Sequence, residues 1–181
     1  MSVEKCVLVG QSGGPTAAIN SSLAGVIAAG IFEGARVEGM RYGIQGLLAG
    51  RHVRLDEAFL SRVDLDLLRN TPASWLGSCR YKLPDPAVDE APYELLFRRF
   101  EEVGATAVLY IGGNDSMDTI AKLGAYGRDH GSDIRFIGVP KTIDNDLVGT
   151  DHTPGYGSAA RFVATAMNEI AYDADVYDLK S

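Results

Sequence analysis

The chain has 181 residues, 46% hydrophobic and 23% charged, which is typical of a single globular domain with a substantial core. Its net charge of −7 disfavours a nucleic-acid surface, because such a surface needs a basic stripe. No apolar run approaches the ~18 residues of a membrane-spanning helix. The two cysteines, Cys6 and Cys79, lack Cys-x-x-Cys spacing, so we expect neither a disulfide framework nor a zinc site, and a cytoplasmic protein fits.

The first half of the chain begins with an apolar run, a glycine turn and a helical pattern. Val3–Val9 predicts a buried strand, and Thr16–Phe32 carries apolar residues at helical spacing after Pro15. Arg36–Arg41 predicts a second strand. Short helices are expected at Gln45–Ala49 and Leu65–Arg69, and the Pro-, Ser- and Gly-rich stretch Thr71–Asp89 predicts a functional loop.

The second half alternates helices and strands more regularly. The expected elements are a helix over Pro92–Val103, a strand over Ala105–Ile111, a helix over Ser116–His130, a strand over Ile134–Val139 and a helix over Tyr156–Tyr172. The apolar residues of the last helix predict a packed face: Phe162, Val163, Ala166, Met167 and Ile170.

This alternation predicts an α/β fold of three layers, αβα, with a mostly parallel sheet. In such sheets ligands bind beyond the carboxyl ends of the strands. Three loops at strand ends are rich in glycine or acidic residues, namely Gln11–Pro15, Gly112–Ser116 and Pro140–Asp146. We therefore expect these loops to converge at one edge of the sheet.

The residues of these loops favour phosphoryl transfer. Paired glycines after a strand let backbone N–H groups approach a phosphate closely, since no Cβ stands in the way. The carboxylates and amide of Asp144-Asn145-Asp146 offer oxygen ligands for magnesium and a base for a hydroxyl. An acidic protein that handles phosphates must concentrate cations locally, and the candidates are Arg80, Lys82 and Lys141.

Taken together, these motifs resemble the phosphofructokinase family, and within it the pyrophosphate-dependent branch. The resemblance covers nearly the whole chain in the family's order. It runs through Gly13–Asn20, Gly77–Arg80, Gly112–Ser116, Pro140–Asp146 and Gly149–Gly155. Lipid and NAD kinases also use a Gly-Gly-Asp-Gly turn, but the run Pro-Lys-Thr-Ile-Asp-Asn-Asp excludes them.

The resemblance implies a Mg²⁺-dependent transfer of a phosphoryl group from pyrophosphate to the 1-hydroxyl of fructose 6-phosphate, in glycolysis or gluconeogenesis. It assigns catalysis to Asp144 as general base, with Lys141 and Asp115. Thr142 and Ile143 join Asp144 in binding the sugar phosphate. The implied pyrophosphate-binding residues are Gly13, Gly14, Arg80, Gly113 and Ser116.

Two positions distinguish the phosphoryl donors. ATP-dependent relatives carry glycine at the places of Asp115 and Lys141, which leaves room for a nucleotide. The resemblance implies that Asp115 sets a carboxylate against the α-phosphate of ATP and that Lys141 sets an ammonium beside the transferred group. Both residues favour pyrophosphate.

The resemblance places Asn114 at the magnesium ligand, where relatives commonly carry aspartate. An amide oxygen binds magnesium without adding charge, so we expect the local charge to come from Asp115 instead. Asp146 either reaches the metal through water or orients its loop.

The resemblance makes residues 1–181 a donor-binding N-terminal α/β domain that is incomplete, because the acceptor-binding remainder of the fold, with its Met-Gly-Arg motif, is absent. We expect the fragment alone to be inactive or nearly so. When complete, the family assembles into dimers or tetramers. The alternatives are an ATP-dependent 6-phosphofructokinase and a truncated, non-catalytic phosphate-binding module.

Overall fold

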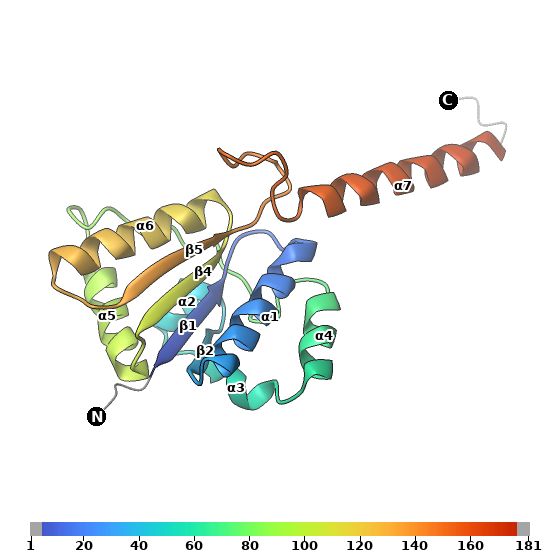
Figure 1. Cartoon of the computed structure of the whole chain (residues 1–181). Coiled ribbons are helices and arrows are strands. Elements are labelled where there is room, and N and C mark those ends of the chain that lie inside the picture. Colours follow the sequence, from blue (N-terminus) through green and yellow to red (C-terminus); the bar gives the residue numbers. More distant parts are fainter. Residues whose placement is uncertain (1–4, 177–181) are drawn as a thin grey trace.

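The computed structural model describes residues 5–176, which build one five-stranded sheet covered by helices (Figure 1). The strands are β1 (Cys6–Gln11), β2 (Arg36–Met40), β3 (His52–Arg54), β4 (Ala107–Gly112) and β5 (Arg135–Pro140). Their order is β3-β2-β1-β4-β5, and every neighbouring pair is parallel except β2 and β3. The predicted α/β fold with a mostly parallel sheet is confirmed.

The helices begin where the sequence offers capping groups. The side chain of Thr16 accepts a hydrogen bond from the amide of Ala18, and Ser61 and Asp64 form a reciprocal capping box. The helices are α1 (Ala17–Phe32), α2 (Gly43–Leu48), α3 (Leu55–Ala58), α4 (Arg62–Asn70), α5 (Ala91–Val103), α6 (Asn114–Asp129) and α7 (Tyr156–Val176). Where the sequence predicted an element, its bounds agree to within four residues over the described part of the chain.

Two apolar clusters fill the space on either side of the sheet. Alternate strand residues face opposite sides, so Leu8 joins one cluster and Val9 the other. Helices α2, α5 and α6 pack over the first cluster, and α1, α3 and α4 pack over the second (Figure 1). The three-layer αβα architecture is therefore confirmed, with Cys6 buried in the core as expected for an apolar strand residue.

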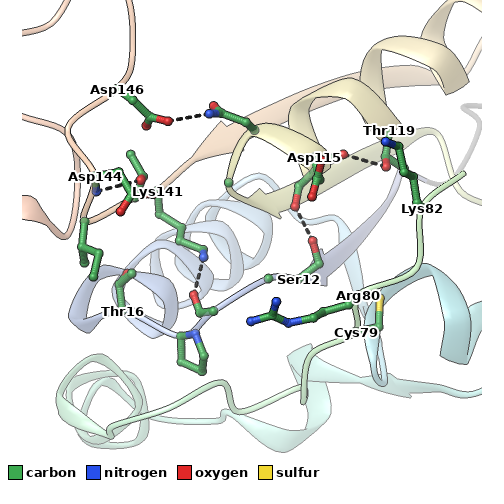
Figure 2. A pocket seen from close by; sticks show the side chains of 18 of the residues that line it. Ser12, Thr16, Cys79, Arg80, Lys82, Asp115, Thr119, Lys141, Asp144 and Asp146 are labelled. Carbon is green, nitrogen blue, oxygen red and sulfur yellow. Dashed lines mark hydrogen bonds between the residues drawn. The ribbon is translucent and has the colours of Figure 1, made fainter.

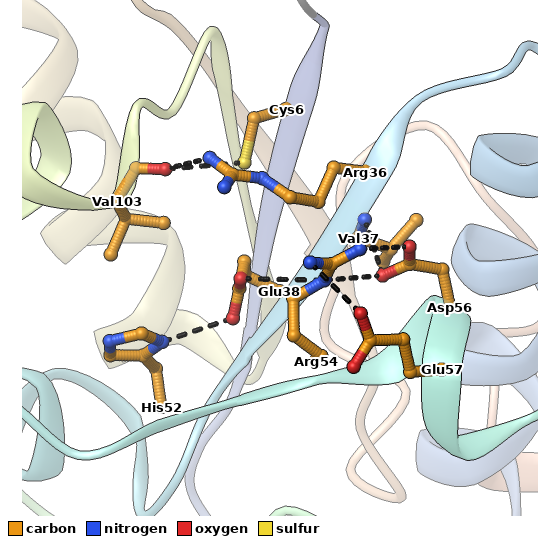
Figure 3. A network of polar contacts seen from close by, with 9 residues as sticks. All are labelled: Cys6, Arg36, Val37, Glu38, His52, Arg54, Asp56, Glu57 and Val103. Atoms are coloured by element: carbon orange, nitrogen blue, oxygen red, sulfur yellow. Dashed lines mark hydrogen bonds and ion pairs between the residues drawn. The ribbon is translucent and has the colours of Figure 1, made fainter.

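The short edge strand β3, which the sequence analysis missed, is held by ion pairs to a buried carboxylate. Glu38 of β2 is only 4% exposed, and its carboxylate lies 3.0 Å from His52 Nδ1 and 3.7 Å from Arg54 Nε (Figure 3). Arg54 also pairs with Asp56 at 2.6 Å and Glu57 at 3.1 Å. The hydrogen bond from Arg54 lowers the pKa of Asp56. These side-chain contacts add to the antiparallel backbone pairing of β3 with β2 and to the packing of Val53 against the core.

Helix α7 forms as predicted, but the expectation that it packs through an apolar face is wrong. Over its whole length none of its side chains is buried, and Phe162 is 73% exposed. Figure 1 shows α7 running away from the sheet, with no other part of the described chain beside it. The apolar spacing is real, but no described element covers it. None of the described helices, α7 included, has the length and apolarity needed to cross a bilayer.

Gly46 in α2 is a sensitive position for stability. A Cβ at Gly46 would collide with the backbone carbonyl of Arg41, which cannot move aside as a side chain can. We expect Gly46→Ala to lower the free energy of unfolding by about 1–3 kcal/mol. Gly25→Ala is the matched control, because a Cβ there meets open space and alanine favours the helix by ~1 kcal/mol. Denaturant unfolding of both variants measures the difference, and equal stabilities would contradict the clash.

Candidate functional site

The carboxyl ends of β1, β4 and β5 meet at one edge of the sheet, and a cavity of about 680 Å³ lies there. The loops after these three strands form its walls together with residues 79–82 (Figure 2). All eleven residues predicted for the site line this cavity: Gly13, Gly14, Arg80, Gly113, Asn114, Asp115, Ser116, Lys141, Thr142, Ile143 and Asp144. The predicted convergence of the three loops is therefore confirmed.

Lys141 brings a buried positive charge to the cavity. Lys141 as a whole is only 4% exposed, and its Nζ donates a hydrogen bond to the carbonyl of Gly14 (Figure 2). Its backbone N–H donates to Gly112 O at 2.9 Å, which joins the end of β5 to the end of β4. Burial lowers the pKa of Lys141, and the nearby Asp144 carboxylate partly opposes this shift.

Gly13 makes the turn after β1 possible. Its φ of 76° lies in the left-handed region that favours glycine, and a Cβ there would stand 3.3 Å from the Nζ of Lys141. The backbone N–H of Gly13 donates to Cys79 O at 3.2 Å, and its carbonyl accepts from Ser78 Oγ at 2.5 Å. The glycine turn is thus fixed against both the ammonium and the loop before Arg80.

The first turn of α6 closes the opposite wall. This helix has 16 residues and begins at Asn114, so its N-terminus carries free N–H groups and a partial positive charge. The hydroxyls of Ser116 and Ser12 are hydrogen-bonded to each other, which joins this turn to the end of β1 (Figure 2). Asp115 lines the cavity from the same turn. The wall therefore combines anion-binding N–H groups with one carboxylate.

Asp144 lies in the loop after β5 and is exposed on the cavity wall. Its backbone N–H donates to Thr142 Oγ1 at 3.0 Å, which fixes the start of the loop. Asn145 adopts a left-handed φ of 56°, and its side chain accepts from Thr153 N at 2.9 Å and donates to Asp151 O at 3.0 Å. These bonds hold the backbone on both sides of the Asp144 carboxylate.

Asn114 and Asp146 meet across the cavity. The Nδ2 of Asn114 donates to Asp146 Oδ2 at 2.6 Å, so a residue of α6 contacts the loop after β5. Within residues 5–176 no group of three or more His, Cys, Asp or Glu side chains is arranged to hold a metal ion. The donors that remain for magnesium are the amide oxygen of Asn114 and the carboxylates around it.

Arg80 reaches the cavity (Figure 2) from a loop whose preceding segment is held by two buried amide side chains. Gln11 Nε2 donates to Asn20 Oδ1 at 3.0 Å, and Gln11 Oε1 accepts from Ser74 Oγ and from Leu76 N, both at 2.9 Å. Asn20 is bonded in turn to the backbone at positions 71 and 75. The segment before Arg80 is thus tied to β1 and α1.

Sequence reasoning missed the residues that support the site. Gln11 and Ser12 lie in a loop that the sequence analysis singled out and Asn20 lies in a family motif, but none of the three was given a role. Their partners in residues 71–76 and in α6 lie 51 to 104 residues away in the chain. The one available signal was a glutamine at the end of an apolar strand. An amide buried there needs hydrogen-bond partners, so it indicates that polar groups from other segments lie nearby.

Comparison with known proteins gives a consistent set of relatives. Residues 6–178 match the family described as Phosphofructokinase. A pyrophosphate–fructose 6-phosphate 1-phosphotransferase of Xanthomonas campestris pv. campestris (strain B100) is 42% identical over 167 residues, 92% of this chain and 40% of that protein. An ATP-dependent 6-phosphofructokinase of Histophilus somni (strain 2336) is 32% identical over 92% of this chain and 48% of its own.

The solved structures agree. A pyrophosphate-dependent phosphofructokinase from Nitrosospira multiformis superimposes with a TM-score of 0.84 at 38% identity, over 93% of this chain and 42% of that chain. This chain therefore spans less than half the length of these relatives.

Proposed function

We propose, from the premise that this chain belongs to the phosphofructokinase family, that it moves a phosphoryl group from pyrophosphate to the 1-hydroxyl of D-fructose 6-phosphate with Mg²⁺. The chain forms the donor-binding N-terminal part of this enzyme. The names of relatives at about 40% identity support this donor and acceptor. A cytoplasmic place in glycolysis or gluconeogenesis and assembly into homodimers or tetramers belong to the same proposal.

One observation carries the proposal: the Lys141 ammonium and the Asp144 carboxylate share a cavity with the Gly13-Gly14 turn and the start of α6. In-line phosphoryl transfer depends on positioning and on stabilising charge, and this arrangement offers both. The N–H of Gly14 and those at the start of α6 hold the pyrophosphate, with Gly13 shaping the turn, and Lys141 stabilises charge on the transferred group.

Asp144 accepts the proton of the attacking 1-hydroxyl. Thr142 Oγ1 already accepts the N–H of Asp144, so its own hydroxyl proton is left to donate to an acceptor oxygen, with Ile143 beside it. Arg80 offers a planar fork of donors to the phosphate that leaves or is transferred. The base Asp144 and the ammonium of Lys141 thus come from the loop after β5, whereas Arg80 comes from a separate loop.

Magnesium fits this site chiefly as a partner of pyrophosphate. Asn114 offers one neutral oxygen, and magnesium often reaches proteins through one or two side chains plus substrate phosphates. When bound, the ion neutralises charge on the phosphoryl oxygens.

A coupled assay on the full-length protein tests the proposal. We expect fructose 6-phosphate to be phosphorylated with pyrophosphate and Mg²⁺, and only a trace rate with ATP. Turnover with ATP alone would contradict the donor. Binding of pyrophosphate by calorimetry without any turnover would instead indicate the non-catalytic phosphate-binding module, for which the Asp144 carboxylate has no use.

We expect Asp115 to disfavour ATP as the phosphoryl donor. Replacing it with glycine removes a carboxylate from the wall that a nucleotide's α-phosphate would face, so kcat/KM with ATP should rise about 10-fold or more. Asp115→Asn separates charge from size, because it removes the charge alone. Parallel kinetics with ATP and pyrophosphate check this, and an unchanged rate with ATP in both variants would refute the role.

The pH dependence of kcat should reflect the ionisation of Lys141. Its ammonium is lost as pH rises through its pKa, and burial places that pKa below the usual lysine value. We therefore expect kcat to fall on the alkaline side at a pH where an exposed lysine is still charged. Lys141→Arg keeps its charge there, so this limb should disappear. An identical alkaline limb in the arginine variant would assign it to another group.

A further inference from the structure

The loop after β5, residues 141–155, is folded largely on itself. Thr142 N donates to Pro154 O at 3.0 Å, and Thr153 Oγ1 donates to Thr142 O at 2.9 Å. Asn145 closes the tip through its bonds to positions 151 and 153. A loop with such internal bonding moves as a unit, so its few ties to the rest of the protein decide where Asp144 lies.

Two ties connect this loop to the rest of the cavity wall. At its start, Lys141 bonds through its backbone to Gly112 and through Nζ to Gly14. Past Lys141, among the described residues, the only side-chain hydrogen bond from the loop to another element joins Asp146 to Asn114 of α6 (Figure 2). The Asp144 carboxylate lies between these two ties in the sequence. The bond of Asp146 to Asn114 therefore closes the loop over the cavity.

The direction of this bond follows from its chemistry. A carboxylate only accepts, so the group of Asn114 that faces Asp146 is the NH₂, and the amide oxygen points away from it. A charge-assisted bond of this kind is stronger than a neutral one. We propose that Asp146 is a positioning residue: it holds the Asn114 amide with its oxygen free for the metal and pins the Asp144 loop, and it is not itself a metal ligand.

The proposal explains how a neutral amide serves at this position. Two facing carboxylates would need a cation between them, whereas an amide and a carboxylate attract each other directly. The loop therefore closes without metal, and the metal enters with pyrophosphate. Only this last step rests on the proposed function; the closure of the loop does not.

The metal affinity of Asp146 variants tests whether Asp146 positions Asn114 or binds the metal itself. We compare Asp146→Ala with Asp146→Asn in the full-length protein by titrating Mn²⁺ in the presence of pyrophosphate, with free Mn²⁺ followed by electron paramagnetic resonance. The asparagine oxygen still accepts the bond from Asn114, so Asp146→Asn should weaken Mn²⁺ binding less than about fivefold. Asp146→Ala should weaken it about 10- to 100-fold. Equal losses in the two variants would make Asp146 a metal ligand and overturn the proposal.

Hydrogen exchange of the metal-free protein tests the closure without any ligand. Amides of residues 141–147 should exchange about 10-fold faster in Asp146→Ala and in Asn114→Ala, and the double variant should be no faster than either. Asp151→Ala, an exposed carboxylate in the same loop, is the control and should match wild type. Unchanged exchange in Asp146→Ala would refute the closure, whereas a failure to bind pyrophosphate would count against the proposed function alone.

Discussion

Asp144→Asn should lower kcat about 10³-fold in the full-length protein and leave the KM for pyrophosphate nearly unchanged. Asparagine has the size of aspartate but cannot take the proton of the 1-hydroxyl. The bond from the backbone N–H of residue 144 to Thr142 Oγ1 does not involve the side chain, so the loop keeps its shape. Initial rates of fructose 1,6-bisphosphate formation, and of the reverse reaction, measure the effect.

The control for this prediction is Asp151→Asn, which removes a carboxylate from the same loop at a position that does not line the cavity. Its kcat should equal that of wild type. A kcat of Asp144→Asn within about tenfold of wild type would show that another group accepts the proton.

Lys141→Met should lower kcat about 10²- to 10³-fold, equivalent to roughly 3 kcal/mol of transition-state stabilisation. Methionine retains most of the length of the lysine stem, but it brings no charge to the transferred phosphoryl group. It also loses the bond to Gly14 O, so the glycine turn is held less firmly. Because lysine is desolvated here, we expect the variant to remain folded, and its Tm tests that directly.

Lys122→Met is the matched control for the loss of a lysine charge. Its Nζ lies 2.7 Å from Asp118 on the same helix and 3.2 Å from Leu83 O, and it does not line the cavity. Its kcat should stay close to wild type. If Lys141→Met were as active as this control, the ammonium would have no part in the reaction.

The sequence predicted the sheet well where packing is apolar and poorly where it is polar. Runs such as Ala107–Gly112 are buried between two helical layers, so hydrophobicity alone identifies them. The strand His52–Arg54 is exposed or half-buried, and its ends pair with the buried carboxylate of Glu38, a contact that no local pattern reveals. The prediction of a packed face on α7 failed for the opposite reason. The apolar residues have helical spacing there, but no described part of the chain covers them.

The convergence of the three loops could be predicted from the sequence because it follows from the parallel topology of the sheet. Once three strands run the same way, the loops after them must meet, and the glycines and carboxylates in those loops meet with them. What the sequence could not supply was the partner of each side chain. The contact of Asn114 with Asp146 spans 32 residues, and nothing in either short motif indicates that one accepts a bond from the other.

The amide pair Gln11 and Asn20 has an energetic consequence for ligand affinity. If Arg80 lay on a disordered loop, the backbone of that loop would lose conformational entropy each time an anion bound, at a cost of about 1–2 kcal/mol for every residue ordered. Here that entropy is lost once, during folding, because the core amides hold the segment from Thr71 to Leu76 in place beforehand. Under the proposed function, the backbone that leads to Arg80 is thus already ordered when an anion binds, and more of the contact energy appears as affinity.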